Sequence, residues 1–507
     1  MLASVATFAI EGVDSVEVTA EVDVRRGLPA FTVVGLPDAA VREARERVRA
    51  ALLNSGLEFP LKRLTANLAP ADLRKTGPSF DLAIAVAVLA ASGQVPFDSL
   101  CGSAVCGELS LGGELRPVQG SIAVAFGARR AGIERLIVPV ENAPEAALVE
   151  GVEVIGVPSL RLMADLLRGR FVPDPPPAPS QPYPGDRDDD LDLSDVRGQH
   201  DARRALEIAA AGGHHLLMVG PPGVGKTMLA RRLAAILPPP DLDEALEITR
   251  VHSIVGLAHG RLARERPFRA PHHTISPSGL VGGGSVPRPG EITLAHRGVL
   301  FLDELAEFSR SALEALREPL EAGRVEISRR QRTLTFPADF MLIAACNDCP
   351  CGRRGDQCTC GEPDKARYRR RLSGPLLDRI DLLCTLDPEP PVGLAGERQE
   401  VSVRSAAVRE RVVAARGLAA HRLAGTGERT NAAMGPRLTR TVVRIDRAAR
   451  THLADGRRLA ALTARGQDRV LRLARTIADL EGSERVGAAH VDEALGYRMG
   501  AGWQIAA

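Results

Sequence analysis

The stretch Gly220-Pro221-Pro222-Gly223-Val224-Gly225-Lys226-Thr227 decides the fold of this chain, because it fits the complete pattern G-x-x-x-x-G-K-[ST] of a phosphate-binding loop. The apolar run at residues 216–219 predicts a buried strand before the loop, and apolar residues at helical spacing predict a helix after it. A strand, a glycine-rich turn and a helix N-terminus direct backbone N–H groups at one anionic point. We therefore expect Lys226 to contact the β- and γ-phosphates of a nucleotide and the Thr227 hydroxyl to hold Mg²⁺.

A second motif supplies the acidic half of the same site. The run Gly298-Val-Leu-Phe-Leu-Asp303-Glu304 is apolar and ends in two carboxylates, as expected where a central strand of a parallel sheet reaches its C-terminal end. Asp303 suits the coordination shell of Mg²⁺, and Glu304 could polarise the water that attacks the γ-phosphate. Behind a complete phosphate loop, this pair predicts hydrolysis of a nucleoside triphosphate, for which ATP is the expected substrate.

Composition limits the class of protein. The chain has 507 residues, enough for about three domains, and 45% hydrophobic residues. We find no apolar stretch of the roughly 18 residues that a membrane span requires, and no basic residue before Glu11 that would begin a signal peptide. These features predict a cytoplasmic protein without a membrane partner.

The charge is distributed unevenly along the chain. The net charge is +2, but residues 401–507 contain 19 Arg against 10 acidic residues. A basic terminal region is typical of a polyanion partner such as DNA. The alternative is a solvated surface in an arginine-biased protein, since only four of the basic residues are Lys. Aromatic residues make up only 3%, which argues against recognition by base stacking.

Proline-rich breaks divide the chain. Residues 173–184 are rich in Pro and are followed by an Asp-rich run to residue 190, which predicts an extended linker. The alternation at residues 16–24 predicts a half-exposed strand before this linker. The predicted fold class is α/β, with an α/β domain at 1–171, a linker at 172–191, an ATPase core at 192–389 and a helical region at 390–507.

Further motifs carry a resemblance to a known family. The most specific are Arg266-Pro-Phe-Arg-Ala-Pro-His-His-Thr-Ile-Ser276, Leu280-Val-Gly-Gly-Gly284, Pro287-Arg-Pro-Gly-Glu-Ile292 and Ser373-Gly-Pro-Leu-Leu-Asp-Arg-Ile-Asp381. With these motifs the chain resembles the magnesium-chelatase-like AAA+ ATPases of the ComM/YifB family over essentially its whole length. The resemblance implies an N-terminal Lon-protease-like domain, a central AAA+ phosphate-loop sheet and a C-terminal helical lid. It also implies a hexameric ring that drives branch migration of DNA during natural transformation.

The resemblance assigns three more residues to ATP hydrolysis. Asn347 follows an apolar strand and matches sensor 1, a polar group that orients water and the γ-phosphate. Arg379 matches the arginine finger, which acts on the nucleotide of a neighbouring subunit. Arg465 matches sensor 2. An ordinary ion pair of Arg379 with Asp378 or Asp381 is the alternative.

Residues 321–336 are expected to form a hairpin, two strands around a polar turn, with Arg329, Arg330 and Arg332 near its tip. In related ATPases this hairpin projects into the pore of the ring, where arginines can hold DNA phosphates without reading sequence. A solvated turn is the alternative. His272 and His273 lack partners at metal-ligand spacing, so we expect them to pack or to fix a loop.

Four cysteines form the compact pattern C-x-C-x6-C-x-C. In a reducing cytoplasm, disulfides are not expected, and four thiolates this close could bind a structural Zn²⁺ in tetrahedral geometry. The spacing is tighter than that of the usual C-x2-C pairs. The predicted ligands are Cys349, Cys351, Cys358 and Cys360.

The N-terminal segment resembles the Lon protease domain but lacks its catalytic lysine. Ser79 falls where Lon has its nucleophile, and Ile122 stands where Lon has its lysine. Without an amine to accept its proton, the Ser79 hydroxyl would not be activated. We therefore expect a binding or ring-organising domain rather than a protease.

Together, these features predict an ATP- and Mg²⁺-dependent AAA+ motor with branch-migration or helicase activity on DNA of any sequence, and the resemblance implies that it forms a hexameric ring. Two alternatives remain open. One is the ATPase motor subunit of a magnesium chelatase, which lacks a Lon-like domain and the cysteine cluster. The other is an ATP-switched scaffold that does not bind DNA.

Overall fold

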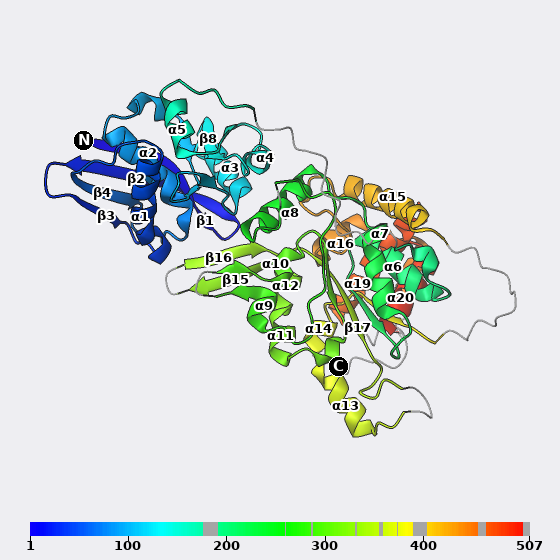
Figure 1. Cartoon of the computed structure of the whole chain (residues 1–507). Helices are drawn as coiled ribbons and strands as arrows, with labels where there is room; N and C mark the ends of the chain where they lie inside the picture. Colours follow the sequence, from blue (N-terminus) through cyan, green and yellow to red (C-terminus); the bar gives the residue numbers. More distant parts are fainter. Residues whose placement is uncertain are drawn as a thin grey trace. The chain divides into compact units, whose positions relative to one another are not determined.

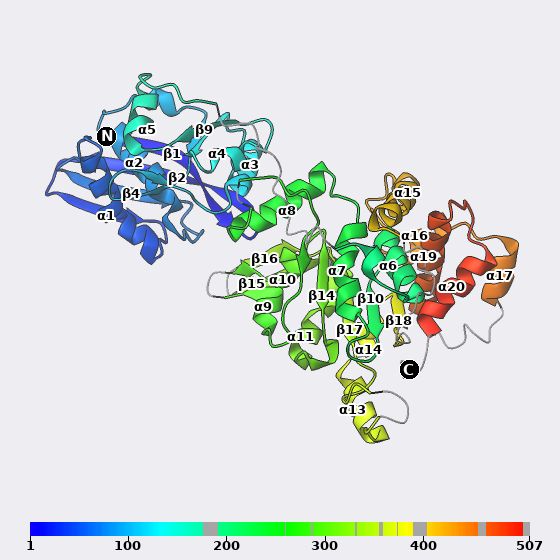
Figure 2. The same cartoon turned by 45° about the vertical axis from the view of Figure 1, so that its right-hand side comes forward.

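The computed structural model describes residues 1–175, 191–258, 260–284, 287–329, 332–353, 358–372, 374–388, 403–454 and 463–499 (Figures 1 and 2). The chain folds into two compact units. The first comprises Met1–Tyr183, Asp241–Arg264 and Ser328–Thr335, and the second comprises Pro184–Pro240, Glu265–Ile327 and Phe336–Ala507. The predicted linker falls mostly outside the described residues. The predicted domain boundaries stay a prediction.

The first unit is built on a mixed sheet of seven strands in the order β3-β4-β2-β1-β5-β8-β9. The long hairpin β1–β2 and the pair β2–β4 are antiparallel, and the other neighbours are parallel. Buried and less buried residues alternate along β2, as the sequence predicts for residues 16–24. The strands are β1 (Leu2–Glu11), β2 (Asp14–Arg25), β3 (Ala30–Val34), β4 (Arg63–Ala69), β5 (Ser103–Val105), β8 (Arg135–Pro139) and β9 (Glu153–Val157), with a short pair β6 (Glu108–Leu109) and β7 (Leu115–Arg116).

Helices cover this sheet. Every residue of α2 is buried, because the helix is apolar on all sides and packs against α1, β1 and β2. Asp38 caps α1 by accepting a hydrogen bond of 2.9 Å from the Val41 N–H. The helices are α1 (Ala39–Asn54), η1 (Pro78–Phe80), α2 (Asp81–Ala91), η2 (Phe97–Leu100), α3 (Ser121–Arg130), α4 (Ala143–Ala146) and α5 (Leu160–Leu167).

Helix α8 (Leu242–Ile254) belongs to the first unit, although its residues lie inside the segment that the sequence assigns to the ATPase core. It packs against α3. The Ser253 carbonyl accepts a hydrogen bond of 3.2 Å from the Gly120 N–H. Arg250 forms an ion pair of 3.2 Å with Asp14 and lies over the ring of Phe126. The sequence of an amphipathic helix shows that one of its faces is buried, but it does not show against which unit that face packs.

The second unit contains a parallel sheet of five strands in the order β11-β14-β17-β10-β18. The three central strands are buried at every position, which explains why they read as continuous apolar runs. The strands are β10 (Leu216–Val219), β11 (Phe268–Arg269), β14 (Val299–Leu302), β17 (Met341–Cys346) and β18 (Leu382–Thr385).

Short helices and two strand pairs accompany this core, although Ser328–Thr335 of the second strand pair is grouped with the first unit. The predicted hairpin is present as the two-stranded sheet β15–β16. Arg330 and the side chains of Arg329 and Arg332 lie outside the described residues. The elements are η3 (Leu193–Asp195), α6 (His200–Gly212), α7 (Lys226–Ile236), α9 (Pro277–Val281), β12 (Gly282–Gly283), β13 (Arg288–Pro289), α10 (Glu291–Leu294), η4 (Leu305–Glu307), α11 (Arg310–Ala315), α12 (Arg317–Ala322), β15 (Arg324–Arg329), β16 (Arg332–Pro337), α13 (Glu362–Arg371) and α14 (Gly374–Leu377).

The described C-terminal part is helical, as predicted. Helices α15 and α19 pack on α6, and α20 packs on β18, so the lid and the sheet share one hydrophobic core (Figure 2). None of the helices in the described residues has the length and apolar character needed to cross a membrane. The helices are α15 (Ser405–Leu423), α16 (Pro436–Val442), α17 (Arg447–Ala454), α19 (Ala464–Leu480) and α20 (Ala488–Met499).

Candidate nucleotide-binding site

The phosphate loop joins β10 to α7, as the sequence predicts. Gly223 and Gly225 have φ angles of 80° and 98°, a left-handed conformation that side chains rarely adopt. A Cβ atom on Gly220 would lie 2.7 Å from the Leu386 carbonyl oxygen, so the loop needs glycine there as well. No side chain caps the N-terminus of α7. Its first N–H groups are therefore suited to an anion such as a nucleotide phosphate.

Lys226 lies at the centre of this loop and is largely buried. Its ammonium group donates hydrogen bonds to the carbonyl oxygens of Gly220 and Pro221, at 2.7 and 2.9 Å. It also donates to Asn347 Oδ1 at 3.1 Å. The predicted loop lysine and the predicted sensor 1 residue are thus in direct contact, although they are far apart in the sequence.

Thr227 and Asp303 also meet, because β10 and β14 both lie beside β17 and end at the same edge of the sheet. The Thr227 hydroxyl donates a hydrogen bond of 2.6 Å to Asp303 Oδ2. A hydroxyl and a carboxylate are hard oxygen ligands of the kind that Mg²⁺ prefers. The two side chains therefore fit the magnesium ion that the sequence predicts, and they would hold it beside the phosphate loop.

Glu304 adopts an unusual backbone conformation, with φ of 52° and ψ of 48°. This left-handed conformation is uncommon for a residue other than glycine and is typical of functional sites. The side chain is 55% exposed, and its Oε2 atom lies 3.1 Å from His273 Nδ1. His273 is therefore a neighbour of the predicted catalytic carboxylate, which sequence reasoning missed.

The ring of His273 is itself held in place. It meets the ring of Phe308 edge-on, with the ring centres 6.5 Å apart, and lies tilted against the ring of His272, with the centres 4.1 Å apart. His272 contacts a different group, the Thr274 hydroxyl, at 2.9 Å. We expected these two histidines only to pack or to fix a loop, and that expectation did not include the contact of His273 with Glu304. The one feature of the sequence that could have suggested this contact is the position of His273 in the specific motif at residues 266–276.

The two predicted arginines converge on Glu321. Arg379 Nη2 lies 2.5 Å from Glu321 Oε1, and Arg465 Nη1 lies 3.8 Å from the same oxygen. The Arg379 side chain is only 10% exposed, whereas that of Arg465 is 73% exposed. The carboxylate that pairs with Arg379 is therefore that of Glu321, and not that of Asp378 or Asp381, the two partners considered from the sequence. Glu321 carries no motif, so the sequence offered no signal for it.

Asp381 has a separate role in a buried polar cluster. Its carboxylate lies 3.3 Å from His214 Nδ1 and 3.4 Å from Arg469 Nε. Burial alone would raise the pKa of Asp381, but the hydrogen bond and charge of His214 outweigh it and hold that pKa well below its usual range. This cluster ties the strand that follows Arg379 to lid helix α19.

The four predicted metal ligands lie together. The sulfur atoms of Cys349, Cys351, Cys358 and Cys360 are all within 4.8 Å of one another. Among Cys349, Cys351 and Cys358 the S–S separations are 3.3, 3.6 and 3.7 Å. A tetrahedral ion with Zn–S bonds of about 2.3 Å requires S–S separations of about 3.8 Å, and the sulfur atoms lie close enough together for small shifts to reach that geometry. Backbone N–H groups of Arg353 and Thr359 lower the pKa of Cys351 to about 5.

Ile122, which the sequence predicts to stand where Lon has its lysine, lies in the core of the N-terminal unit. Ile122 is fully buried in α3, among apolar side chains that include Phe8 and Val124. Its N–H donates a hydrogen bond of 3.2 Å to Glu145 Oε1. Lys75 is also buried, and its ammonium group donates to the Pro70 carbonyl oxygen. The environment of Ile122 is therefore that of a core residue.

The fold and the site define the class of this protein as an AAA+ ATPase. Three family models match it: "Magnesium chelatase, subunit ChlI" at residues 192–391, "Subunit ChlI of Mg-chelatase" at residues 20–142, and "Magnesium chelatase, subunit ChlI C-terminal" at residues 402–498. The predicted α/β fold class is confirmed.

Similar proteins narrow the class. The protein YifB of Escherichia coli (strain K12) is 43% identical over 502 residues, which cover 98% of this chain and 97% of YifB. The competence protein ComM of Haemophilus influenzae is 42% identical over 505 residues, with the same coverage. Lon protease 2 of Bacillus subtilis is 29% identical over 181 residues, which cover 31% of this chain and 33% of that protease. The chain belongs to the magnesium-chelatase-like AAA+ family that includes YifB and ComM.

Proposed function

We propose that the protein is an ATP-hydrolysing ring motor that acts on DNA, by branch migration or helicase activity during DNA uptake and recombination. One observation carries the ATPase part of the proposal. Lys226 and Thr227 begin the helix after the phosphate loop, Asp303 and Asn347 directly follow β14 and β17, and the four side chains contact one another in pairs. The likeness to a protein named for competence supports DNA as the substrate.

Each residue of the site has a proposed task. The backbone of residues 220–227 and the Lys226 ammonium group bind the phosphates of ATP. Thr227 and Asp303 hold Mg²⁺, which neutralises charge on the phosphates when it is bound. Glu304 accepts the proton of the attacking water, and Asn347 orients that water. Since these groups are fixed by the ends of buried strands, little reorganisation is needed when ATP binds.

The remaining groups act between subunits or on the lid. Arg379 would leave Glu321 and stabilise the charge that develops on the γ-phosphate of a neighbouring subunit. Arg465 would report the nucleotide to the lid. Both roles require a ring of several copies, for which we propose a hexamer. Residues Arg329, Arg330 and Arg332 would hold DNA phosphates from the hairpin. A cytoplasmic location and a Lon-like domain without protease activity are part of the same proposal.

We also propose that the four cysteines bind one structural Zn²⁺ ion. The site lies directly beside the nucleotide pocket, because Cys349 follows Asn347 by two residues. A Cβ atom on Gly352 would lie only 2.6 Å from Pro222 Cγ. The cysteine loop thus packs tightly against the phosphate loop. A metal ion that fixes this loop would also support the phosphate loop.

Two substitutions test the ATPase proposal. Lys226→Ala should abolish ATP binding, because the charge that meets the β- and γ-phosphates is lost. Glu304→Gln should retain bound ATP but reduce turnover by at least about 100-fold, because an amide cannot accept the proton of water. Equilibrium binding of labelled ATP and the rate of phosphate release distinguish the two. Normal turnover by Glu304→Gln would show that another group is the base.

A magnesium-chelatase motor is the second candidate, because the matching family models carry that name. Stimulation of the ATPase by DNA favours the DNA motor. An ATPase that ignores DNA and responds only to a porphyrin-binding partner subunit favours the chelatase. A scaffold that only binds ATP would show no turnover in either assay.

A further inference from the structure

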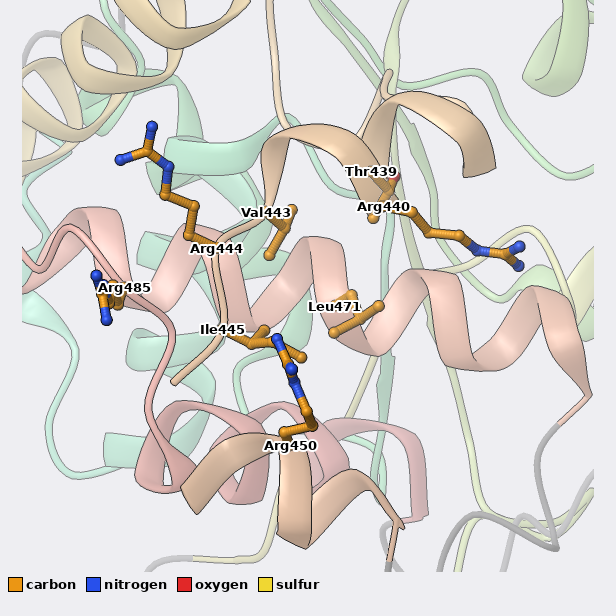
Figure 3. Close-up of a pocket in the computed structure, with 8 residues that line it drawn as sticks. All are labelled: Thr439, Arg440, Val443, Arg444, Ile445, Arg450, Leu471 and Arg485. Atoms are coloured by element: carbon orange, nitrogen blue, oxygen red, sulfur yellow. The ribbon is translucent and has the colours of Figure 1, made fainter. Parts of the chain in front are cut away.

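Four arginines surround a hollow in the C-terminal helical part of the second unit (Figure 3). The hollow has a volume of about 460 Å³ and lies between α16, α17, α19 and the segment before α20. Its lining contains no acidic residue among those described. The residues are Thr439, Arg440, Val443, Arg444, Ile445, Arg450, Leu471 and Arg485.

The arginines are available to a ligand. Within the described part of the chain, the side chains of Arg450 and Arg485 make no ion pair or hydrogen bond. Arg444 pairs with Glu484 at 2.7 Å, but both side chains are more than 70% exposed. Arg440 is 67% exposed and lies 3.4 Å from Asp468. The exposed Arg444–Glu484 pair is weak, so a phosphate group can compete with Glu484 for Arg444. Asp468 is only 9% exposed, so Arg440 is the least available of the four arginines.

The arrangement of the side chains indicates the shape of the ligand. In Figure 3, Arg450 extends toward Ile445 and Leu471, whereas Arg440 and Arg444 extend away from each other on opposite sides. The guanidinium groups therefore do not converge on one point, as they would around a single small anion. They are distributed around an apolar floor. This distribution fits a sugar–phosphate backbone, in which successive phosphates contact the arginines and the carbon atoms of the sugars lie on the apolar side chains of the hollow.

We propose that this hollow binds the phosphodiester backbone of DNA without reading its sequence. The inference rests on the proposed DNA motor and adds a second contact, separate from the hairpin. Arginine is suited to phosphate because its planar group donates two parallel hydrogen bonds. No aromatic side chain lines the hollow, so base stacking contributes nothing there and every sequence should bind alike.

The test compares two double variants of the full-length protein. Arg450→Ala/Arg485→Ala removes the two arginines that have no described partner, so it leaves no acidic residue unpaired. Arg26→Ala/Arg161→Ala removes the same charge from exposed positions in the first unit and serves as the control. Binding of a fluorescent DNA duplex is measured by anisotropy over a range of NaCl concentrations. Basal ATPase activity is measured in parallel.

We expect the hollow variant to bind about tenfold or more weakly at low salt. The slope of log K against log salt should become shallower by about two units, one for each lost phosphate contact. The control and the basal ATPase should match the wild type. Unchanged affinity and slope in the hollow variant would overturn the inference while leaving the DNA motor intact. Failure of the wild type to bind any DNA would instead overturn the proposed function, and this inference with it.

Discussion

At the scale of single residues, the proposed catalytic carboxylate of Glu304 contacts a histidine that lies in a specific motif but was not predicted to be its partner. Glu304 is half exposed and is not held by burial, but His273 lies 3.1 Å from its carboxylate. The sequence predicts Lys226, Thr227 and Asp303 because their spacing follows from the geometry of a loop between a strand and a helix. The contacts of His273 and Glu321 arise from folding of distant segments, which spacing cannot reveal.

Replacing His273 tests whether this contact positions the base. His273→Ala should lower kcat by about 10- to 100-fold with KM for ATP unchanged, because a small misplacement of the base affects the chemical step and not binding. His273→Asn, which keeps a polar group, should recover part of the loss. His272→Ala is the matched control and should resemble the wild type in steady-state ATPase assays. A faster ATPase in His273→Ala would contradict positioning and indicate that the contact restrains Glu304.

At the scale of elements, the sequence predicts the strands of the central sheet, but it does not predict in which of the two compact units some other segments pack. Buried parallel strands read as apolar runs, so β10, β14 and β17 could be placed from sequence. Helix α8 has an amphipathic sequence that is compatible with either unit, and only the structure shows that it packs on α3. The cysteine loop was predicted as a metal site, but its packing against Pro222 was not.

Changes in the cysteine loop should affect ATP binding. Metal analysis of the purified protein should find about one zinc per chain, and Cys351→Ser should lower both zinc content and ATP affinity. Gly352→Ala should keep the zinc but weaken ATP binding by about tenfold, because the new Cβ would lie 2.6 Å from Pro222 Cγ. Cys101→Ser, at an exposed position in the first unit, is the control. Zinc-free protein that is purified without chelators and binds ATP normally would contradict this account.

At the scale of the whole molecule, we propose that the nucleotide site of one chain is completed by Arg379 of a neighbouring copy. Arg379 is paired with Glu321 within its own chain. Its proposed role as an arginine finger would require it to leave this partner and to contact the nucleotide of a neighbouring subunit. The resemblance of the sequence to ring-forming ATPases predicts this role of Arg379. The structure of a single chain does not contain the neighbouring nucleotide that Arg379 would contact. The stoichiometry of the ring depends on surfaces between copies, which neither motifs nor one chain define.

Mixing two inactive variants tests action between subunits. Arg379→Ala should bind ATP normally but lose most of its turnover, and Lys226→Ala should not bind ATP. A mixed ring contains interfaces at which an intact nucleotide site meets an intact arginine. The mixture should therefore regain part of the ATPase activity in a phosphate-release assay. Activity that never exceeds that of the two variants alone, over a range of mixing ratios, would argue against a finger in trans.

The central claim is that ATP hydrolysis by this protein is coupled to DNA. The most direct measurement is the steady-state ATPase rate of the wild type with no DNA, single-stranded DNA, duplex DNA and a four-way junction, with Glu304→Gln as the blank. We predict that DNA raises the rate and that the junction raises it most. A wild-type rate that is well above the blank but identical with and without every DNA would contradict the claim.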